Sequence, residues 1–199
     1  MAGEPIPVFV HQNLDTERIV VRNLYGPTED TTYSTIYHLH KEQPLLIGKP
    51  ISNTFVRIIN KEGNLVPIGV PGEICLGGAG LARGYLNRDE LTAEKFIRDL
   101  FTEEKKSRLY KTGDLGRWLE EGNIEYLGRL DNQVKIRGYR RELGEIENVI
   151  QQSGLVNQAV VIAHTNESGI KTLVGYIVPK DSFNKEALLT YLYSKLPEY

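Results

Sequence analysis

Residues 23–29, Asn-Leu-Tyr-Gly-Pro-Thr-Glu, bring an aromatic ring, a hydroxyl and a carboxylate together in one short stretch. Gly26 and Pro27 predict a tight turn, which would present these side chains from the same loop. A tyrosine face can stack on a base, a hydroxyl can bond a phosphate oxygen, and a carboxylate can hold Mg²⁺ that bridges phosphates. The set suits a nucleotide, although an ordinary surface turn would have the same composition.

Two later stretches add acidic and basic side chains that could contact a sugar. Asp114 follows Gly113 within residues 110–115, and a carboxylate can accept both hydrogens of a ribose diol. Arg129 and Asp131 follow within residues 126–131. An exposed turn aspartate is the simpler explanation of Asp114, and the residues alone leave both interpretations open.

The glycine-rich stretch 77–84 fits neither common phosphate-binding pattern. The Walker pattern would need Gly-Lys-Ser/Thr at its end, and none is present. In the dinucleotide pattern counted from Gly78, the third glycine would fall at position 83, which is Arg83. We therefore predict a bulged turn at which a strand bends.

Other kinds of site find less support. Residues 129–141 contain five basic side chains, but Tyr139 is the one aromatic residue among them and the net charge is −2, so we expect no nucleic-acid partner. His38 and His40 would point to one side of a strand, yet no third ligand is spaced nearby for a metal. No Ser-His-Asp or Cys-His arrangement can be argued from the spacings.

Composition limits the class of protein. The 199 residues are 40% hydrophobic and 25% charged, which is typical of a globular chain. The longest apolar runs span a few residues, far below the roughly 20 that cross a bilayer, so we expect no membrane partner. No secretory signal follows Met1, which favours a cytoplasmic protein. Cys75, between Ile74 and Leu76, is expected to be a buried structural thiol.

The pattern of apolar residues changes along the chain. Ile19, Val20 and Val21 predict a short buried strand, and residues 48–129 contain β-rich runs at 55–59 and 72–76. A hairpin is predicted around the turn 121–123. This part is expected to form a small barrel or a curled sheet.

After Asp131 the pattern becomes mixed. Leu143 and Ile146 begin a helical spacing that continues to residue 150, and residues 159–163 and 172–178 read as strands joined by a polar turn at 166–169. Ser182 would cap a last helix, which Pro197 would end. We expect an α+β fold, with a β-barrel-like subdomain over residues 1–131 and a smaller α+β subdomain over 132–199.

The order and spacing of these motifs resemble the adenylation domains of nonribosomal peptide synthetases, within the wider adenylate-forming superfamily. The matching stretches are residues 23–29, 72–86, 110–115, 128–138 and 142–147, and residues 196–199 look like the start of another. The resemblance implies the last third of such a domain. Residues 1–131 would be the C-terminal part of its large subdomain, and residues 132–199 a truncated lid.

In this family an amino acid carboxylate attacks the α-phosphorus of ATP, and a phosphopantetheine thiol on a carrier domain then captures the acyl-adenylate. The resemblance therefore implies ATP and Mg²⁺ as cofactors. It implies an amino acid, a phosphopantetheinylated carrier domain and the remaining part of the adenylation domain as partners.

Residue roles are implied by position in the motifs. The residues that match nucleotide-binding positions are Asn23, Tyr25, Gly26, Thr28, Asp114, Tyr126 and Arg129. Tyr25 would stack on adenine beside Asn23, and Thr28 would bind phosphate. Asp114 and Arg129 would grip the ribose in a pocket lined by Tyr126.

Further roles concern the metal, the hinge and the substrate. Glu29 would hold Mg²⁺, Asp131 would be the hinge of the small subdomain, and Gly138 would lie where the pantetheine arm approaches. The residues that match the substrate pocket are Ala2, Leu24, Thr32 and Tyr33. None of these four is charged, which favours a small aliphatic amino acid such as alanine.

Two parts of the family pattern are missing. No Ser/Thr-rich, glycine-rich phosphate loop precedes Asn23, and the lysine near the family's C-terminus would fall after Tyr199. The parent family is enzymatic, but we assign no catalytic residue to this chain. The alternatives are a part of another acyl or aryl adenylate-forming ligase, and a catalytically inert remnant or interaction module.

Overall fold

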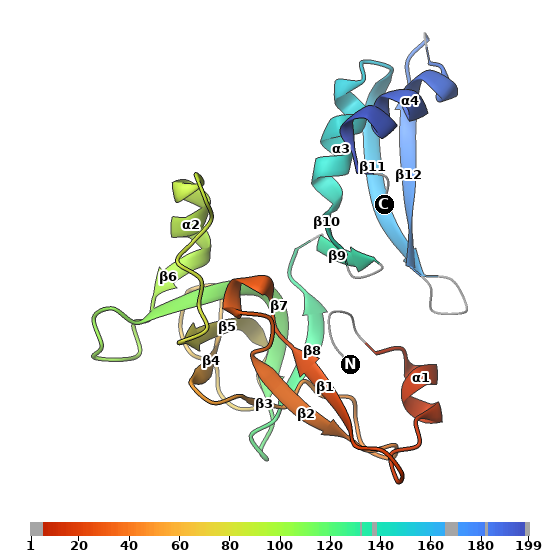
Figure 1. The fold of residues 1–199 in the computed structure, drawn as a ribbon. Helices are drawn as coiled ribbons and strands as arrows, with labels where there is room; N and C mark the ends of the chain where they lie inside the picture. The colour runs from red at the N-terminus through yellow and green to blue at the C-terminus, as the bar shows by residue number, and fades with distance from the viewer. Residues whose placement is uncertain (1–5, 132, 137–138, 166–170, 182, 198–199) are drawn as a thin grey trace. The chain divides into compact units, whose positions relative to one another are not determined.

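A computed structural model describes residues 6–131, 133–136, 139–165, 171–181 and 183–197 (Figure 1). The chain divides into two compact units, Met1–Asp131 (unit 1) and Asn132–Tyr199 (unit 2). Each unit has its own core, and each is described by itself below.

Unit 1 begins with a three-stranded antiparallel sheet in the order β1-β2-β3. Its elements are α1 (Val8–Asn13), β1 (Val21–Tyr25), the 3₁₀ helix η1 (Thr28–Asp30), β2 (Thr35–Leu39) and β3 (Lys49–Pro50). The prediction of a buried strand at residues 19–21 is wrong for the first two of these residues. Ile19 and Val20 are 55% and 76% exposed and precede β1, so they add no core contact.

The second sheet of unit 1 has five antiparallel strands, in the order β4-β5-β7-β6 with β8 also paired to β7. These strands and the helix between them are β4 (Thr54–Ile59), β5 (Gly72–Gly78), α2 (Asp89–Lys95), β6 (Phe96–Arg98), β7 (Arg108–Trp118) and β8 (Ile124–Arg129). The predicted hairpin around residues 121–123 is confirmed by the pairing of Trp118 with Ile124. Bulges in the β5–β7 and β7–β8 ladders bend the strands.

The expected barrel is a curled half-barrel. The strand order has ends at β4 and β6, so the sheet does not close on itself. A bridge between Gly48 and Ile124 links the segment before β3 to β8. The curvature brings the end of β1 close to the middle of β7, as the hydrogen bonds described below show.

Both faces of β5 are buried. Ile74 and Leu76 belong to a cluster that includes Ile58 and Ile124, whereas Cys75 packs on the other face near Leu109. Because side chains alternate along a strand, the continuous apolar run of β5 fills two cores. The prediction of a buried thiol is confirmed, and burial raises the pKa of Cys75 to about 12.

The described residues of unit 2 form two antiparallel strand pairs and two helices. Its elements are β9 (Gln133–Ile136), β10 (Tyr139–Glu142), α3 (Leu143–Gln152), β11 (Val156–Thr165), β12 (Lys171–Pro179) and α4 (Lys185–Lys195). Side chains from both helices and from β11 share one core, made of Leu143, Ile150, Val156, Ala159, Val161 and Leu188. The predicted helix at 143–150 and the two longer strands are confirmed.

The start of α4 differs from the prediction. Asn184 is the N-cap, and its side chain accepts a hydrogen bond of 2.9 Å from the backbone N–H of Ala187. Ser182, the predicted cap, lies outside the described residues, as does the predicted turn at 166–169.

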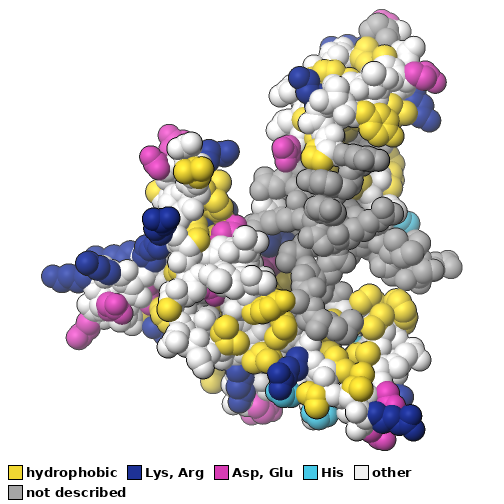
Figure 2. Space-filling model, viewed as in Figure 1, with side chains coloured by type: hydrophobic (Ala, Val, Ile, Leu, Met, Phe, Trp, Pro, Cys, Tyr) yellow, Lys and Arg dark blue, Asp and Glu magenta, His cyan; other side chains and the backbone are white. Residues whose placement is uncertain are grey.

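The surface carries charges of both signs. Figure 2 shows Lys and Arg side chains beside acidic ones at the loop between β6 and β7, where Glu103 and Glu104 precede Lys105 and Lys106. Among the described residues, no helix combines the length and the apolar character needed to span a bilayer.

Candidate functional site

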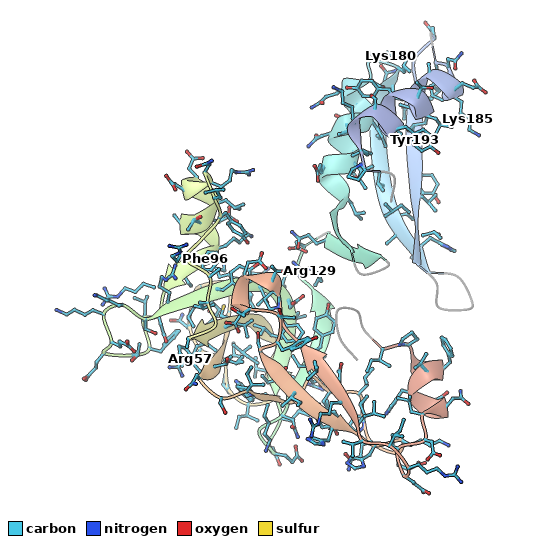
Figure 3. The ribbon with its side chains drawn as sticks, in the orientation of Figure 1. Arg57, Phe96, Arg129, Lys180, Lys185 and Tyr193 are labelled. Carbon is cyan, nitrogen blue, oxygen red and sulfur yellow. The ribbon has the colours of Figure 1, made fainter. Side chains whose placement is uncertain are left out.

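Three strands of unit 1 bring Tyr25, Asp114 and Arg129 together. The Tyr25 hydroxyl donates a hydrogen bond of 2.6 Å to Asp114 Oδ2, and Arg129 Nη1 donates one of 2.9 Å to Asp114 Oδ1. Tyr25 ends β1, and Asp114 on β7 pairs with Arg129 at the end of β8. Figure 3 labels Arg129. Residues from three distant motifs thus meet at one carboxylate.

The charges of this group are set by burial and by each other. Burial raises the pKa of Tyr25 well above its usual value, and the Asp114 carboxylate raises it further, so the hydroxyl remains a donor. Burial lowers the pKa of Arg129, but its bonds to Asp131 and the Asp114 charge outweigh this and raise it. The guanidinium therefore stays charged beside the buried Asp114 carboxylate, which needs such a partner.

Arg129 also binds Asp131, in a bidentate pair. Nε donates to Asp131 Oδ1 at 2.7 Å and Nη2 donates to Oδ2 at 2.6 Å. Gly113 makes room for this pair: its φ is +73°, and a Cβ there would lie 2.6 Å from Arg129 Nη2 and 2.7 Å from Asp131 Oδ2. The glycine beside Asp114 thus leaves the space that this ion pair occupies, and its positive φ is a conformation that glycine adopts readily.

Tyr126 lies beside the same group. Its ring centroid is 6.3 Å from that of Tyr25, with the two planes inclined by 44°. Burial, followed by the Asp114 charge, raises the pKa of Tyr126 to about 12. The structure thus brings together Tyr25, Asp114, Tyr126, Arg129 and Asp131, all of which the sequence motifs had singled out.

The end of β1 and the turn after it are held by close contacts with neighbouring backbone. Asn23 of β1 is buried, and its Nδ2 donates a hydrogen bond of 2.8 Å to the carbonyl of Leu46. A Cβ at Gly26 would lie 2.7 Å from both Ser34 N and Thr32 O, so only glycine lets the turn pack against the chain before β2. Asn23 therefore anchors β1, and its place beside a base stays a prediction.

Thr28 and Glu29 lie on η1. Thr28 is exposed, whereas Glu29 is half-buried and its Oε1 accepts a bond of 2.7 Å from the Tyr85 hydroxyl. The described residues contain no group of three His, Cys, Asp or Glu side chains that could hold a metal. A single carboxylate nevertheless fits Mg²⁺, which is commonly bound through one or two carboxylates together with substrate phosphates.

Sequence reasoning assigned no role to Tyr85. It lies in the matching stretch 72–86, but no spacing rule connects it to Glu29, which is 56 residues away in the chain. The contact depends on how the loop after β5 folds back onto η1.

The predicted substrate-pocket residues lie on β1 and in the loop before β2. Leu24 is on β1, and Thr32 and Tyr33 follow η1, with Tyr33 41% exposed. Thr31 and Thr32 have φ of 49° and 81°, an unfavourable conformation for β-branched residues. Their role as a pocket stays a prediction, and the fourth predicted pocket position, Ala2, lies outside the described residues. Gly138, predicted to lie where the pantetheine arm approaches, also lies outside them.

Asp30, next to Glu29, is a buried carboxyl with incomplete hydrogen bonding. The Ser34 hydroxyl donates to its Oδ2 at 2.6 Å, and Oδ1 has no hydrogen-bond partner among the described residues. Burial raises the pKa of Asp30, and the Ser34 bond lowers it by a smaller amount.

Asp30 is expected to make the stability of unit 1 depend on pH. At pH values between 3.8, the ordinary pKa of Asp30, and its raised pKa in the folded state, the folded protein holds a proton on Asp30 that the unfolded chain has lost. Raising the pH through this window therefore lowers the free energy of unfolding. Asp30→Asn should gain stability relative to wild type as the pH rises through the window, measured by urea unfolding at a series of pH values. Parallel pH profiles for the two proteins would contradict the assignment.

Gly113→Ala should destabilise unit 1 more than Gly122→Ala. Both positions have left-handed backbone, with φ of 73° and 75°, so both alanines carry a similar conformational strain of about 1–2 kcal/mol. At Gly122 a Cβ would meet only the Lys49 side chain, at 3.8 Å or more. Displacing Arg129 and Asp131 should add about 1–3 kcal/mol at Gly113, measured by urea unfolding. Equal losses in the two variants would show that the close approach costs nothing.

Comparison with known proteins identifies the family. The AMP-binding enzyme model matches residues 1–86, and the AMP-binding enzyme C-terminal domain model matches residues 145–199. Tyrocidine synthase 3 of Brevibacillus parabrevis is 50% identical over 179 residues, which are 89% of this chain and 3% of that protein. Bacitracin synthase 1 of Bacillus licheniformis is 48% identical over 181 residues, which are 89% of this chain and 3% of that protein. The chain thus spans a small fraction of the length of these relatives.

Solved structures share the fold over most or all of the chain. The Vibrio cholerae adenylation domain AlmE, in complex with glycyl-adenosine-5'-phosphate, has a TM-score of 0.88 and 27% identity, covering 100% of this chain and 39% of that chain. PA1221, an NRPS protein containing adenylation and PCP domains, has a TM-score of 0.82 and 30% identity, covering 96% and 40%. With the two family matches, these similarities show that the chain belongs to the AMP-binding enzyme family, whose members are adenylate-forming ligases, and is part of a domain of the nonribosomal peptide synthetase type.

Proposed function

We propose that this chain forms the nucleotide-holding part of a domain that joins an amino acid to AMP and passes the product to a phosphopantetheine thiol on a carrier domain. The observation that carries the proposal is the buried Asp114 carboxylate held between the Tyr25 hydroxyl and the Arg129 guanidinium. The relatives support it, because AlmE was solved with an aminoacyl-adenylate and PA1221 contains adenylation and PCP domains.

The nucleoside would bind at this carboxylate. A carboxylate offers about four acceptor sites, so the bonds that hold Asp114 are compatible with its accepting ribose hydroxyls. Tyr25 is tethered through its hydroxyl, which fixes the plane on which adenine would stack. Arg129 would balance the carboxylate charge, and Tyr126 would line the ribose side.

The phosphates would bind near η1. The exposed Thr28 hydroxyl would bond a phosphate oxygen, and the Glu29 carboxylate would hold Mg²⁺. Bound in this way, Mg²⁺ would neutralise charge on the polyphosphate. The chain's own residues would supply position and orientation, which are the main needs of phosphoryl-type transfers.

The two units would act in sequence. The chain divides directly after Asp131, which supports its role as the hinge about which unit 2 turns between adenylation and thiol transfer. Unit 1 would then be the C-terminal part of the large subdomain and unit 2 the lid. The approach of the pantetheine arm near Gly138 remains part of the proposal.

The substrate would be a small aliphatic amino acid such as alanine. Leu24, Thr32 and Tyr33 carry no charge, so they provide no partner for a charged substrate side chain, which is costly to bury alone. Leu24 and the ring of Tyr33 would also fill space in the pocket.

The function is tested by amino-acid-dependent ATP–pyrophosphate exchange. The assay compares the 199-residue chain with the same chain joined to the segments that flank the matched region in its relatives, here named the completed domain. The completed domain should exchange fastest with alanine, and glycine, serine and valine should be slower, because one methylene is worth about 1–3 kcal/mol. The chain alone should be slower by at least about 10²–10³, the usual cost of one missing transition-state donor.

The outcomes separate the parts of the proposal. A completed domain that exchanges with no amino acid contradicts the function. Preference for a charged or large aromatic amino acid contradicts only the pocket, and exchange by the chain alone at the rate of the completed domain contradicts the need for the flanking segments.

Asp114→Ala should weaken ATP binding in the completed domain by removing the proposed ribose contact. A hydrogen bond to a charged acceptor contributes about 1.5–3 kcal/mol, so ATP should bind roughly 10- to 100-fold more weakly. Binding of 2′,3′-dideoxy-ATP, which lacks the two hydroxyls, should weaken less than that of ATP, because it loses only the support that Asp114 gives to Tyr25 and Arg129. Calorimetry can compare the two nucleotides. Asp15→Ala, at an exposed aspartate in unit 1, serves as the control. Equal weakening of both nucleotides by Asp114→Ala would refute the ribose contact.

A further inference from the structure

The glycine-rich loop after β5 docks onto η1, and the nucleotide site described above gives it no role. Ala82 N donates to the Glu29 carbonyl at 2.8 Å, and the Thr31 hydroxyl donates to the Gly80 carbonyl at 2.6 Å. The Tyr85 hydroxyl donates to Glu29 Oε1 at 2.7 Å. Backbone and side chain of Glu29 are therefore both held by the same loop.

The glycines of this loop are explained by close approach. A Cβ at Gly80 would lie 2.7 Å from Asp30 Oδ1, next to Glu29. Gly84 has φ of 151°, and a Cβ there would overlap the Thr92 side chain of α2. The stretch predicted as a bulged turn is thus a loop that packs tightly between η1 and α2.

The ring of Tyr85 is fixed from two sides. It packs edge-on against Phe96 of β6, which Figure 3 labels, with ring centroids 5.6 Å apart and planes inclined by 69°. Its backbone N–H donates to the Thr92 hydroxyl at 2.9 Å. Phe96 in turn packs against the fully buried Tyr110, with centroids 5.0 Å apart. The hydroxyl of Tyr85 is therefore presented to Glu29 by a rigid support.

We propose that Tyr85 is a positioning residue that orients the Glu29 carboxylate for its divalent cation, and that the glycine-rich loop exists to place it. The inference rests on the proposed role of Glu29 as the cation ligand. Carboxylates that bind metals are themselves hydrogen-bonded, and loss of such a partner typically costs 10–100-fold in metal affinity. The Tyr85 hydroxyl fixes one oxygen of Glu29 and so reduces the ordering that cation binding requires.

Tyr85→Phe in the completed domain removes this hydroxyl and keeps the ring. The variant should bind Mn²⁺ about 10-fold or more weakly in the presence of α,β-methylene-ATP. Electron paramagnetic resonance measures the concentration of free Mn²⁺ in this titration. Tyr37→Phe is the matched control. The Tyr37 hydroxyl donates a hydrogen bond of 3.0 Å to the Gln43 side chain and makes no bond to the loop after β5 among those that the structure describes. The control should bind Mn²⁺ as wild type does.

A second measurement separates positioning from a folding defect. In ATP–pyrophosphate exchange, the Mg²⁺ concentration for half-maximal rate should rise in Tyr85→Phe, and excess Mg²⁺ should restore the rate. Loss of exchange that excess Mg²⁺ does not restore would overturn the inference.

Glu29→Gln shows whether Tyr85 acts through Glu29. Glu29→Gln should itself weaken Mn²⁺ binding, and adding Tyr85→Phe to it should cause no further loss.

If Glu29→Gln weakens binding and Tyr85→Phe does not, the inference is overturned and the role of Glu29 stands. If neither variant changes Mn²⁺ affinity while exchange persists, the role of Glu29 and the inference both fail, but adenylation does not. An equal effect of Tyr85→Phe in both backgrounds would also overturn the inference.

Discussion

The buried carboxylate of Asp114 joins three strands that are far apart in the chain. Its bonds to the Tyr25 hydroxyl and the Arg129 guanidinium connect the end of β1 to β7 and β8. A buried charge without such partners would destabilise the fold, so the same bonds that stabilise the curled sheet also define the site. Stability and the proposed ribose contact thus depend on one set of atoms, and Asp131 is tied to it through Arg129.

A second set of contacts organises the other end of the proposed nucleotide site. There η1 is a 3₁₀ helix of three residues, and the loop after β5 holds it by hydrogen bonds from or to Gly80, Ala82 and Tyr85. The two ends differ physically: strand ladders fix the group around Asp114, whereas a loop packed on α2 and β6 fixes Glu29. All of these residues belong to unit 1, so the proposed contacts to base, ribose, phosphate and cation share one support.

The sequence predicted those features that local periodicity encodes. The β-rich runs of β4 and β5 and the helical spacing of α3 have direct counterparts in the structure. Apolar character alone failed at Ile19 and Val20, because exposure depends on which segment covers a residue. The N-cap was misplaced because serine and asparagine cap equally well, and Asn184 has the extended backbone that precedes α4. Resemblance supplied Tyr25, Asp114 and Arg129, but the contact of Tyr85 with Glu29 follows from loop packing that no spacing rule describes.

The burial of Cys75 has a practical consequence for spectroscopy. It is the one cysteine of the sequence, its side chain is buried in the core on one face of β5, and its thiolate is disfavoured. Dyes or spin labels that need a thiolate would therefore react with a cysteine introduced at an exposed position and leave the native one unmodified. One such cysteine in each unit would allow the distance between the units to be measured without first altering the core.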